Sequence, residues 1–455
     1  MNSCRIFPLL MLLPFVGFCQ PRLPPNYYWK QFDNGLEVVV IENNKVPLAT
    51  VEIAVKNGAY TEGPEYSGLS HLFEHMFFKA NKDYPSQELL LKRIQELGAV
   101  WNGTTGTERV NYFFTFDKDS LTAGLKFMNA CIRFPIYRTE DMAKERPVVD
   151  GEFQRGESSP TFQLYQECQK RLWGDQFTRK NPIGDHTIIN TATPEKMMII
   201  KGRYYHPNNS LLVICGDVQH DQAFALAKSI FGDWPSSGFN PVEKYPVPEF
   251  QPVAATQYFV KESSIAKTPY VYYWWQGPDY RKDSAGTLAA DVFSTLLGLN
   301  SSKWQQALID KGLATVASVS YQSSKYVGPI SIFVVPNPNK LKECNDEILR
   351  QVKMWGQQDY FTDEQLETAK QLLRRQKIRN NEKPSSLPHD LSFWWCSTSL
   401  DYFTDYLDDC LKVTREDIQR YVARYIIGKN YVAGMIINPE MNKQFDASGS
   451  FKPSL

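Results

Sequence analysis

One order of predicted elements occurs twice in the chain, and this repeat limits the possible fold more than any other feature. Each copy opens with strand-like alternation, continues with helical patterns, and ends with a further strand region and a charged helix. The first copy lies at residues 36–55, 67–98, 110–116 and 139–154, and the second at residues 269–276, 285–299, 330–335 and 362–380. The repeat predicts two related units of strands and helices.

A proline-rich segment joins the two copies. Five prolines occur from Pro235 to Pro252, and such a segment cannot continue a helix or a central strand. A chain of 455 residues is also too long for a single core. We therefore expect an N-terminal domain at residues 20–234, a linker at 235–252 and a C-terminal domain at 253–455.

The first copy contains the sequence His-Leu-Phe-Glu-His at residues 71–75, which is typical of a metal site. A helix has about 3.6 residues per turn, so His71 and His75 lie on one face and can bind one cation together. Glu74 lies beside them, where its carboxylate can reach a water instead of the metal, as a hydrolytic base must. The order His-x-x-Glu-His is the inverzincin signature.

Two core histidines satisfied by hydrogen bonds are the structural alternative to a metal site. The chain has only six histidines, so a pair at ligand spacing favours the metal site over chance. The motif is flanked by apolar residues that indicate a buried amphipathic helix, namely Leu69, Leu72, Phe73, Met76 and Phe77. The other histidines, for which we expect structural roles, are His186, His206, His220 and His389.

A catalytic zinc site has three protein ligands and an open position for water, so a third donor is needed elsewhere in the chain. Glu145 and Glu152 would lie two turns apart on one face of a continuous helix. A solvated charged face would give the same pattern. Pro147 predicts that this helix is kinked or begins near Arg146, in which case Glu145 would not share the face of Glu152.

These residues resemble peptidase family M16, the pitrilysin or insulinase family. The segments that carry the resemblance, in the family's order and spacing, are residues 71–75, 98–104, 145–152, 181–184 and 204–218. The resemblance implies that His71, His75 and Glu152 hold one zinc ion, that Glu74 is the general base, and that Glu145 supports catalysis.

The resemblance also implies the fold class. This is α+β, with two homologous mitochondrial-processing-peptidase-like domains, each a mainly antiparallel sheet packed with helices, facing each other across a cleft. An extended peptide would lie in the cleft and add a strand near residues 102–112. We expect Asn102, Thr104 and Tyr112 to bind substrate, while Gly103 stands where the family usually has alanine.

The function implied is that of a zinc metalloendopeptidase acting on extended peptides or unfolded polypeptides. Zinc would lower the pKa of a bound water and polarise the scissile carbonyl, while Glu74 would take the proton and pass it to the leaving amine. Two alternatives belong to other classes: a non-catalytic structural subunit, and a binding module that holds peptides without cutting them. The intact ligands and base argue against a scaffold.

The second copy departs from the family. Residues 289–293 occupy the place of the histidine pair and contain no ligand, and Ile309 and Thr315 stand where the family has an Arg and a Tyr that contact substrate. In the small branch of the family, the zinc motif and this Arg/Tyr pair often belong to different chains. The resemblance therefore implies a zinc-bearing subunit of a heterodimer, with a homodimer as the alternative.

The N-terminus predicts export. Arg5 and the apolar run at residues 7–18 are typical of a secretory signal peptide over residues 1–19, which implies a periplasmic or extracellular location. Lipidation of Cys19 is a weaker alternative, because Phe18 is bulky where such sites prefer a small residue. No other stretch predicts a transmembrane helix.

Composition argues against other classes of function. The chain has 50 basic and 50 acidic residues, so nothing indicates a nucleic acid or an anionic membrane as partner. The cysteines after residue 19 form no Cys-x-x-Cys pair and are expected to be small buried residues, although export would permit disulfides. They are Cys131, Cys168, Cys215, Cys344, Cys396 and Cys410.

Overall fold

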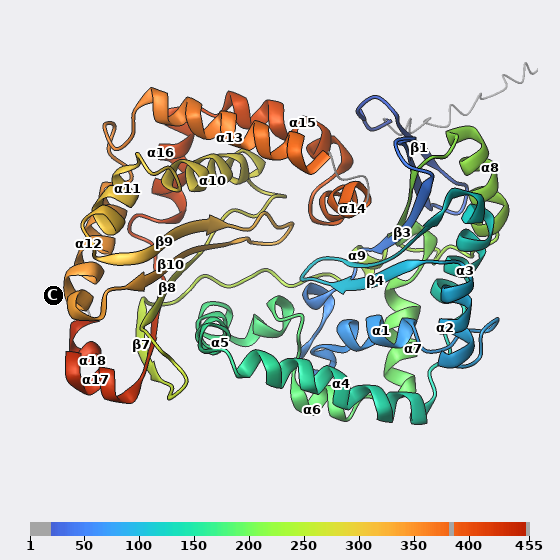
Figure 1. Cartoon of the computed structure of the whole chain (residues 1–455), viewed down its shortest axis with the longest axis horizontal. Coiled ribbons are helices and arrows are strands. Elements are labelled where there is room, and N and C mark those ends of the chain that lie inside the picture. The colour runs from blue at the N-terminus through green and yellow to red at the C-terminus, as the bar shows by residue number, and fades with distance from the viewer. Residues whose placement is uncertain (1–19, 382–385, 452–455) are drawn as a thin grey trace, which may run out of the picture.

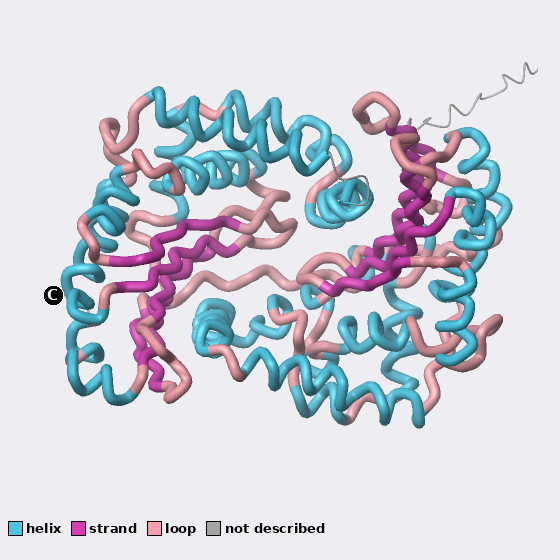
Figure 2. The backbone as a smooth tube through the Cα atoms, viewed as in Figure 1, coloured by secondary structure: helices cyan, strands magenta, loops and turns pink. Residues whose placement is uncertain are grey.

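The computed structural model describes residues 20–381 and 386–451. It contains two sheets, each covered by helices (Figures 1 and 2). The signal peptide predicted at residues 1–19, with Cys19, lies outside the described residues. We call the part that contains the first sheet the first half, and the part that contains the second sheet the second half.

The first sheet has six strands in the order β1-β2-β6-β3-β5-β4. The strands are β1 (Tyr27–Gln31), β2 (Glu37–Glu42), β3 (Leu48–Val55), β4 (Val100–Thr105), β5 (Val110–Asp117) and β6 (Ser210–Gly216). Neighbouring strands are antiparallel except β2 and β6, which are parallel. Strand β4 forms one edge of this sheet and pairs with β5.

The second sheet has five strands in the order β7-β11-β8-β10-β9. They are β7 (Gln257–Glu262), β8 (Tyr270–Gln276), β9 (Ala314–Tyr321), β10 (Pro329–Pro336) and β11 (Val432–Ile437). Here too one pair, β7 and β11, is parallel and the others are antiparallel. This order repeats β2-β6-β3-β5-β4 with the parallel pair in the same place. The predicted repeat and the α+β fold of two related domains are therefore confirmed.

Eight helices of the first half are described. They are α1 (Leu69–Phe77), α2 (Gln87–Glu96), α3 (Leu121–Arg133), α4 (Thr139–Glu157), α5 (Pro160–Trp173), α6 (His186–Asn190), α7 (Pro194–Tyr204) and α8 (His220–Phe231). Side chains alternate along a strand. Val38 and Val40 of β2 therefore face the core beneath α8, whereas Val39 and Ile41 face the opposite side of the sheet.

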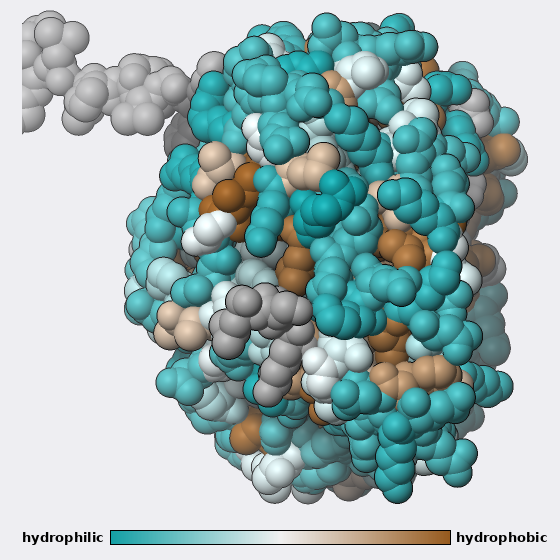
Figure 3. Space-filling model, turned by 90° about the vertical axis from the view of Figure 1, so that its left-hand side faces the viewer, coloured by the Kyte–Doolittle hydropathy of each residue, from teal (hydrophilic) through white to brown (hydrophobic). Residues whose placement is uncertain are grey.

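The second half has its own core beneath a similar helical layer. Its helices are α10 (Ser284–Leu297), α11 (Lys303–Gln305), α12 (Leu341–Met354), α13 (Asp363–Asn381), α14 (Leu387–Ser397), α15 (Leu400–Lys412), α16 (Arg415–Tyr425), α17 (Pro439–Phe445) and α18 (Ala447–Ser450). Its outer face is mostly hydrophilic with scattered hydrophobic residues (Figure 3). Across the described residues, no helix combines the length and apolar composition needed to cross a membrane.

Each half packs a helix on the remaining face of the other half's sheet. Helix α14 of the second half packs on the first sheet, where Leu391 and Trp395 join the cluster that contains Val39. Helix α5 of the first half packs on the second sheet, where Leu164 joins the cluster that contains Val432. Both sheets are therefore buried on two faces, which explains why β2, β6 and β11 are apolar on both sides instead of alternating with polar residues.

The proline-rich join contains no strand, as its prolines require, but it is more than a spacer. It includes the short helix α9 (Pro241–Lys244). Val247 and Phe250 are buried between the halves, and the Phe250 ring lies 5.2 Å from that of Trp173, centroid to centroid. The domain boundaries at residues 234 and 253 remain predictions.

All six described cysteines are buried, as expected.

Candidate metal centre

Helix α1 carries the His-x-x-Glu-His motif on its half-buried side. Its apolar residues Leu69, Leu72, Phe73, Met76 and Phe77 are packed into the core of the first half. The side chains of His71 and His75 are 14% and 15% exposed. The helix predicted from the spacing is therefore present, and its apolar face turns both imidazoles away from the core.

The N-terminus of α1 is capped by a carboxyl group from the preceding loop. Its cap residue, Gly68, provides no side-chain hydrogen bond. Instead Glu62 accepts hydrogen bonds from the amides of Gly68 and Ser70 at 2.7 and 2.6 Å, satisfying two amides that the helix leaves unpaired. Burial raises the pKa of Glu62 to about 8, and these two hydrogen bonds oppose the rise.

Helix α4 supplies two acidic residues to the site. It runs without interruption from Thr139 to Glu157 and contains Pro147 in its interior. Of the outcomes predicted for this proline, a helix that begins near Arg146 is wrong, because a proline removes one hydrogen bond and the turns on both sides can persist. Glu145 and Glu152 therefore lie on one helix, and both reach the histidines of α1.

Three of the predicted residues form a cluster that could hold a metal ion. One donor atom each of His71, His75 and Glu152 lies within 4.8 Å of the others. The Glu152 Oε2 atom is 3.5 Å from Nε2 of His71 and 3.7 Å from Nε2 of His75. Two imidazole nitrogens and one carboxylate oxygen are a donor set found in catalytic zinc sites. The residues present therefore fit zinc.

Glu145 supports the cluster by contacting the ring nitrogen of His75 that does not face Glu152. Its Oε1 lies 2.8 Å from Nδ1 of His75, and its Oε2 forms an ion pair with Lys79. A ring nitrogen bonded to a carboxylate leaves the other nitrogen for the metal, the usual arrangement around metal-binding histidines. Burial raises the pKa of Glu145, but the hydrogen bonds with His75 and Lys79 outweigh it and hold the pKa below its ordinary value.

The two histidines differ in their affinity for protons. Burial lowers the pKa of His71 to about 4, and the charge of His75 acts in the same direction. Burial also lowers the pKa of His75, but the hydrogen bond with Glu145 and the charge of Glu152 outweigh it, so that this pKa lies above its ordinary value. Burial therefore favours neutral His71, the form that binds a metal, whereas a proton competes more strongly with a metal for His75.

Glu74 lies beside strand β4. Its Oε2 accepts a hydrogen bond from the Thr105 hydroxyl at 2.7 Å, while burial raises the pKa of the carboxyl against the effect of this bond. The sequence prediction includes Thr104 and misses Thr105. The strand alternates, so Asn102 and Thr104 are exposed on the opposite side of β4 from Gly103 and Thr105. The assignment of Asn102 and Thr104 to substrate remains a prediction.

Tyr112 occupies a different environment from the one predicted. Its side chain is fully buried, its ring stacks on Phe77 at 3.7 Å between centroids, and its hydroxyl lies 2.9 Å from that of Tyr205. The predicted contact with substrate is not supported, because the side chain has no exposed surface. The sequence does indicate this burial, because every second residue of β5 is apolar, as is typical of a strand with one face in the core.

The remaining histidines each have a structural partner. His206 contacts the Gly202 carbonyl at 2.8 Å, and His220 contacts Glu42 at 2.7 Å. The other two lie against carboxylates, His186 against Asp150 and His389 against Glu52. These contacts agree with the structural roles expected from the sequence.

The second half has no counterpart of this cluster among the described residues. Helix α10 takes the topological place of α1, and its Asp291 accepts a hydrogen bond from the Tyr406 hydroxyl at 2.9 Å. Burial raises the pKa of Asp291 to about 7. Ile309 lies in a π-helical turn (Gln306–Asp310) packed against the second core, and Thr315 is exposed on β9.

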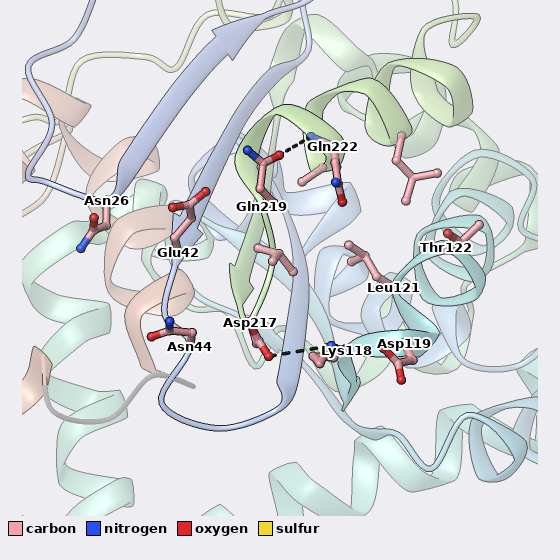
Figure 4. Close-up of a pocket in the computed structure, with 13 residues that line it drawn as sticks. Asn26, Glu42, Asn44, Lys118, Asp119, Leu121, Thr122, Asp217, Gln219 and Gln222 are labelled. Atoms are coloured by element: carbon pink, nitrogen blue, oxygen red, sulfur yellow. Dashed lines mark hydrogen bonds and ion pairs between the residues drawn. The ribbon is translucent and has the colours of Figure 1, made fainter.

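A groove of about 770 Å³ lies elsewhere on the first half, between β2, α3 and α8 (Figure 4). Its lining is polar, and Lys118 and Asp217 face each other there at 3.9 Å. None of the predicted site residues lines it. The chemistry suggested by the motif therefore belongs to the cluster between α1 and α4.

Two family models match the chain. Residues 38–186 match insulinase (peptidase family M16), and residues 192–373 match the peptidase M16 inactive domain. The chain belongs to peptidase family M16. In this M16 chain, the match to the inactive domain covers much of the second half. That half has neither a histidine pair nor a metal cluster among its described residues.

Relatives of this M16 chain are named zinc proteases. It is 24% identical over 398 residues to the zinc protease PqqE of Helicobacter pylori, covering 86% of this chain and 88% of that protein. It is 25% identical over 206 residues to an uncharacterized zinc protease of Rickettsia felis, covering 45% of this chain and only 50% of that protein. These names support a peptidase-like function.

Solved structures share the fold of this M16 chain. A protease from Helicobacter pylori superposes with a TM-score of 0.80 at 22% identity, covering 92% of this chain and 100% of that one. The periplasmic protease PqqL from Escherichia coli gives a TM-score of 0.74 at 15% identity, covering 95% of this chain and 51% of that one. At these identities the likeness shows the fold alone.

Proposed function

We propose that this protein is a zinc-dependent metallopeptidase that hydrolyses peptide bonds of extended peptides or unfolded polypeptides. The observation that carries the proposal is the cluster of His71, His75 and Glu152 with Glu74 beside it. A carboxylate next to a three-residue ligand set is the arrangement that metal-assisted hydrolysis needs, because the ligands and the base must meet at one reacting centre.

His71, His75 and Glu152 would hold the zinc ion. When bound, zinc would lower the pKa of a water toward neutrality and polarise the scissile carbonyl. Glu145 would keep Nε2 of His75 turned toward Glu152 by holding Nδ1, and the Lys79 ammonium would in turn hold Glu145.

Glu74 would move the protons. Thr105 holds Oε2, so we assign the proton transfer to Oε1. This oxygen would accept a proton from the attacking water and then deliver it to the nitrogen of the leaving amine. Partial burial supports this role, because burial raises the pKa of Glu74 and a base with a pKa nearer neutrality can also act as the acid.

Strand β4 would bind the substrate backbone. It forms the edge of the first sheet next to α1, and a peptide added to this edge would pass close to Glu74. Asn102 and Thr104 are exposed along β4 and are the side chains we propose for contact with such a peptide.

The partner and the location are part of the same proposal. Ile309 and Thr315 replace the Arg and Tyr expected of a complete second half, so we propose that a related chain supplies that pair in a heterodimer, with a homodimer as the alternative. The structural neighbour PqqL of Escherichia coli is described as periplasmic. Together with the signal peptide predicted at residues 1–19, this supports a periplasmic or extracellular location.

Zinc content and peptide cleavage separate this proposal from its two alternatives. The purified protein is analysed for bound metal and then incubated with a library of unstructured peptides, with and without a chelator. A metallopeptidase binds about one zinc ion per chain and cleaves only without chelator. A peptide-binding module would retain peptides uncut, and a structural subunit would do neither. If the zinc-loaded protein cleaves nothing alone or together with a related partner chain, the proposed function is wrong.

A further inference from the structure

Strand β4 presents different residues to helix α1 and to solvent. Trp101, Gly103 and Thr105 are buried or half-buried, whereas Asn102 and Thr104 are exposed. Successive side chains of a strand point to opposite faces. Strand β4 and α1 are packed together, so Gly103 and Thr105 lie on the side that touches the motif helix.

Gly103 leaves the space that the Glu74 side chain occupies. A Cβ atom added to Gly103 would lie 2.7 Å from Cγ, 3.0 Å from Oε1 and 3.1 Å from Cδ of Glu74, and these are its three nearest atoms. A carbon at 2.7 Å from another carbon is far inside the optimal separation of about 3.5–4.0 Å. Gly103 does not have a positive φ, so the backbone itself would accept alanine. The obstacle to a side chain at this position is Glu74.

Thr105 fixes the end of the same side chain. Its hydroxyl is 2.7 Å from Oε2 of Glu74 and 3.4 Å from the Ser70 carbonyl oxygen. A hydroxyl has one proton to donate, and the shorter contact, to the carboxylate, is the stronger one. The Glu74 side chain thus lies in the space left by the missing Cβ of Gly103, and Thr105 holds one of its carboxylate oxygens.

We propose that Gly103 and Thr105 are positioning residues that set where the Glu74 carboxylate stands relative to His71, His75 and Glu152. The glycine that replaces the family's usual alanine belongs to this arrangement, because it lets Glu74 lie against β4. The catalytic consequence rests on the proposed function, in which Glu74 is the base, whereas the position of the side chain can be tested without it.

The first test compares hydroxyl variants of Thr105. Thr105→Val removes the donor at nearly constant shape and should lower kcat about 10-fold with little change in KM, since a hydrogen bond to a charged group is lost at the base and not at the substrate. Thr105→Ser restores the donor and should recover kcat to within about 3-fold of the wild type. The matched control is Thr122→Val, at an exposed position on α3. Thr105→Val with the kcat of this control would overturn the proposal.

The second test needs no activity. Crystal structures of metal-free Gly103→Ala and Thr105→Val should show the Glu74 side chain in a changed rotamer, with helix α1 unmoved. The control is Gly202→Ala, because a Cβ at Gly202 has no atom within 4 Å. Glu74 remaining in place in both variants contradicts the proposal even if the enzyme is active. If Glu74 moves while the wild type cleaves no peptide, the proposed function fails and the positioning inference stands.

Discussion

The carboxylate of Glu145 lies 2.8 Å from Nδ1 of His75, which leaves Nε2 of the same ring directed toward Glu152. One acidic residue of α4 therefore orients a histidine of α1, and a second acidic residue of α4 completes the cluster with it. The two roles require the whole of α4 to be a helix, since Glu145 and Glu152 are two turns apart.

Replacing Glu145 should weaken zinc binding without unfolding the protein. Glu145→Gln keeps the shape but removes the charge that holds Nδ1 of His75 and pairs with Lys79. Losses at such supporting residues are typically about 10- to 100-fold in metal affinity. Competition with a chromophoric chelator measures the change. Glu140→Gln, at an exposed position on the same helix, is the control. Equal zinc affinity in the two variants would show that Glu145 does not support the metal site.

Acid should destabilise the metal-free protein partly through His71. Its pKa is about 4 in the folded state, below the ordinary value of 6.5, so the unfolded chain binds more protons between these values. The contribution of His71 to stability is therefore complete above pH 6.5 and is lost as the pH falls toward 4, with a maximum loss of about 3 kcal/mol.

Urea unfolding of metal-free wild type and His71→Gln at several pH values measures this effect. The stability of the wild type relative to the variant should decrease from pH 7 to pH 4, because glutamine does not titrate. His75, whose pKa is raised, changes in the opposite direction, but it is present in both proteins. A difference that does not depend on pH would contradict the assignment of His71 as the neutral ligand.

Glu62 should stabilise α1 in its protonated form. Its folded pKa of about 8 lies above the ordinary 4.5, so its contribution is complete below pH 4.5 and is lost as the pH rises through 8. Glu62→Gln keeps one acceptor oxygen and should cost about 1 kcal/mol, whereas Glu62→Ala leaves the amides of both Gly68 and Ser70 unpaired and should cost about 2 kcal/mol. Equal unfolding free energies of the two variants at pH 7 would rule out the capping role.

The first half should not fold well alone. Expressed as residues 20–234, it would expose the sheet face that α14 covers, including Val39 and Val213. Exposed apolar faces of this kind lead to aggregation. Coexpression with residues 235–455 should restore a soluble complex, as measured by size-exclusion chromatography. A monomeric, cooperatively unfolding first half would show that the exchanged helices are dispensable.

Much of the site could be predicted from local spacing. His71 and His75 are four positions apart, Glu145 and Glu152 are seven positions apart, and both intervals match a helical face. Pro147 suggested a kink or a start of the second helix near Arg146, and the helix does not start there. Local rules overestimate such a break when the flanking turns are held by tertiary contacts, as those of Glu145 and Glu152 with α1 hold α4.

The parts that were missed depend on contacts between distant segments. Whether Thr104 or Thr105 meets Glu74 depends on the register of β4, where a shift of one residue reverses the face. The helix that covers each sheet comes from the other half, and no local pattern says that Leu391 packs against a strand more than 170 residues earlier in the chain. The burial of Tyr112 is different, because the alternation of β5 indicates it, although Phe77 and Tyr205, which contact the side chain, belong to other elements.

The most direct measurement is the cleavage rate of Glu74→Gln compared with its zinc content. Loaded with zinc, the variant should bind about one ion per chain, as the wild type does, because Glu74 is not a ligand. Its turnover of unstructured peptides should fall about 10²- to 10⁴-fold, because glutamine cannot accept the proton. Glu88→Gln, at an exposed position on α2, should match the wild type. Undiminished cleavage by Glu74→Gln at full zinc occupancy would contradict the account.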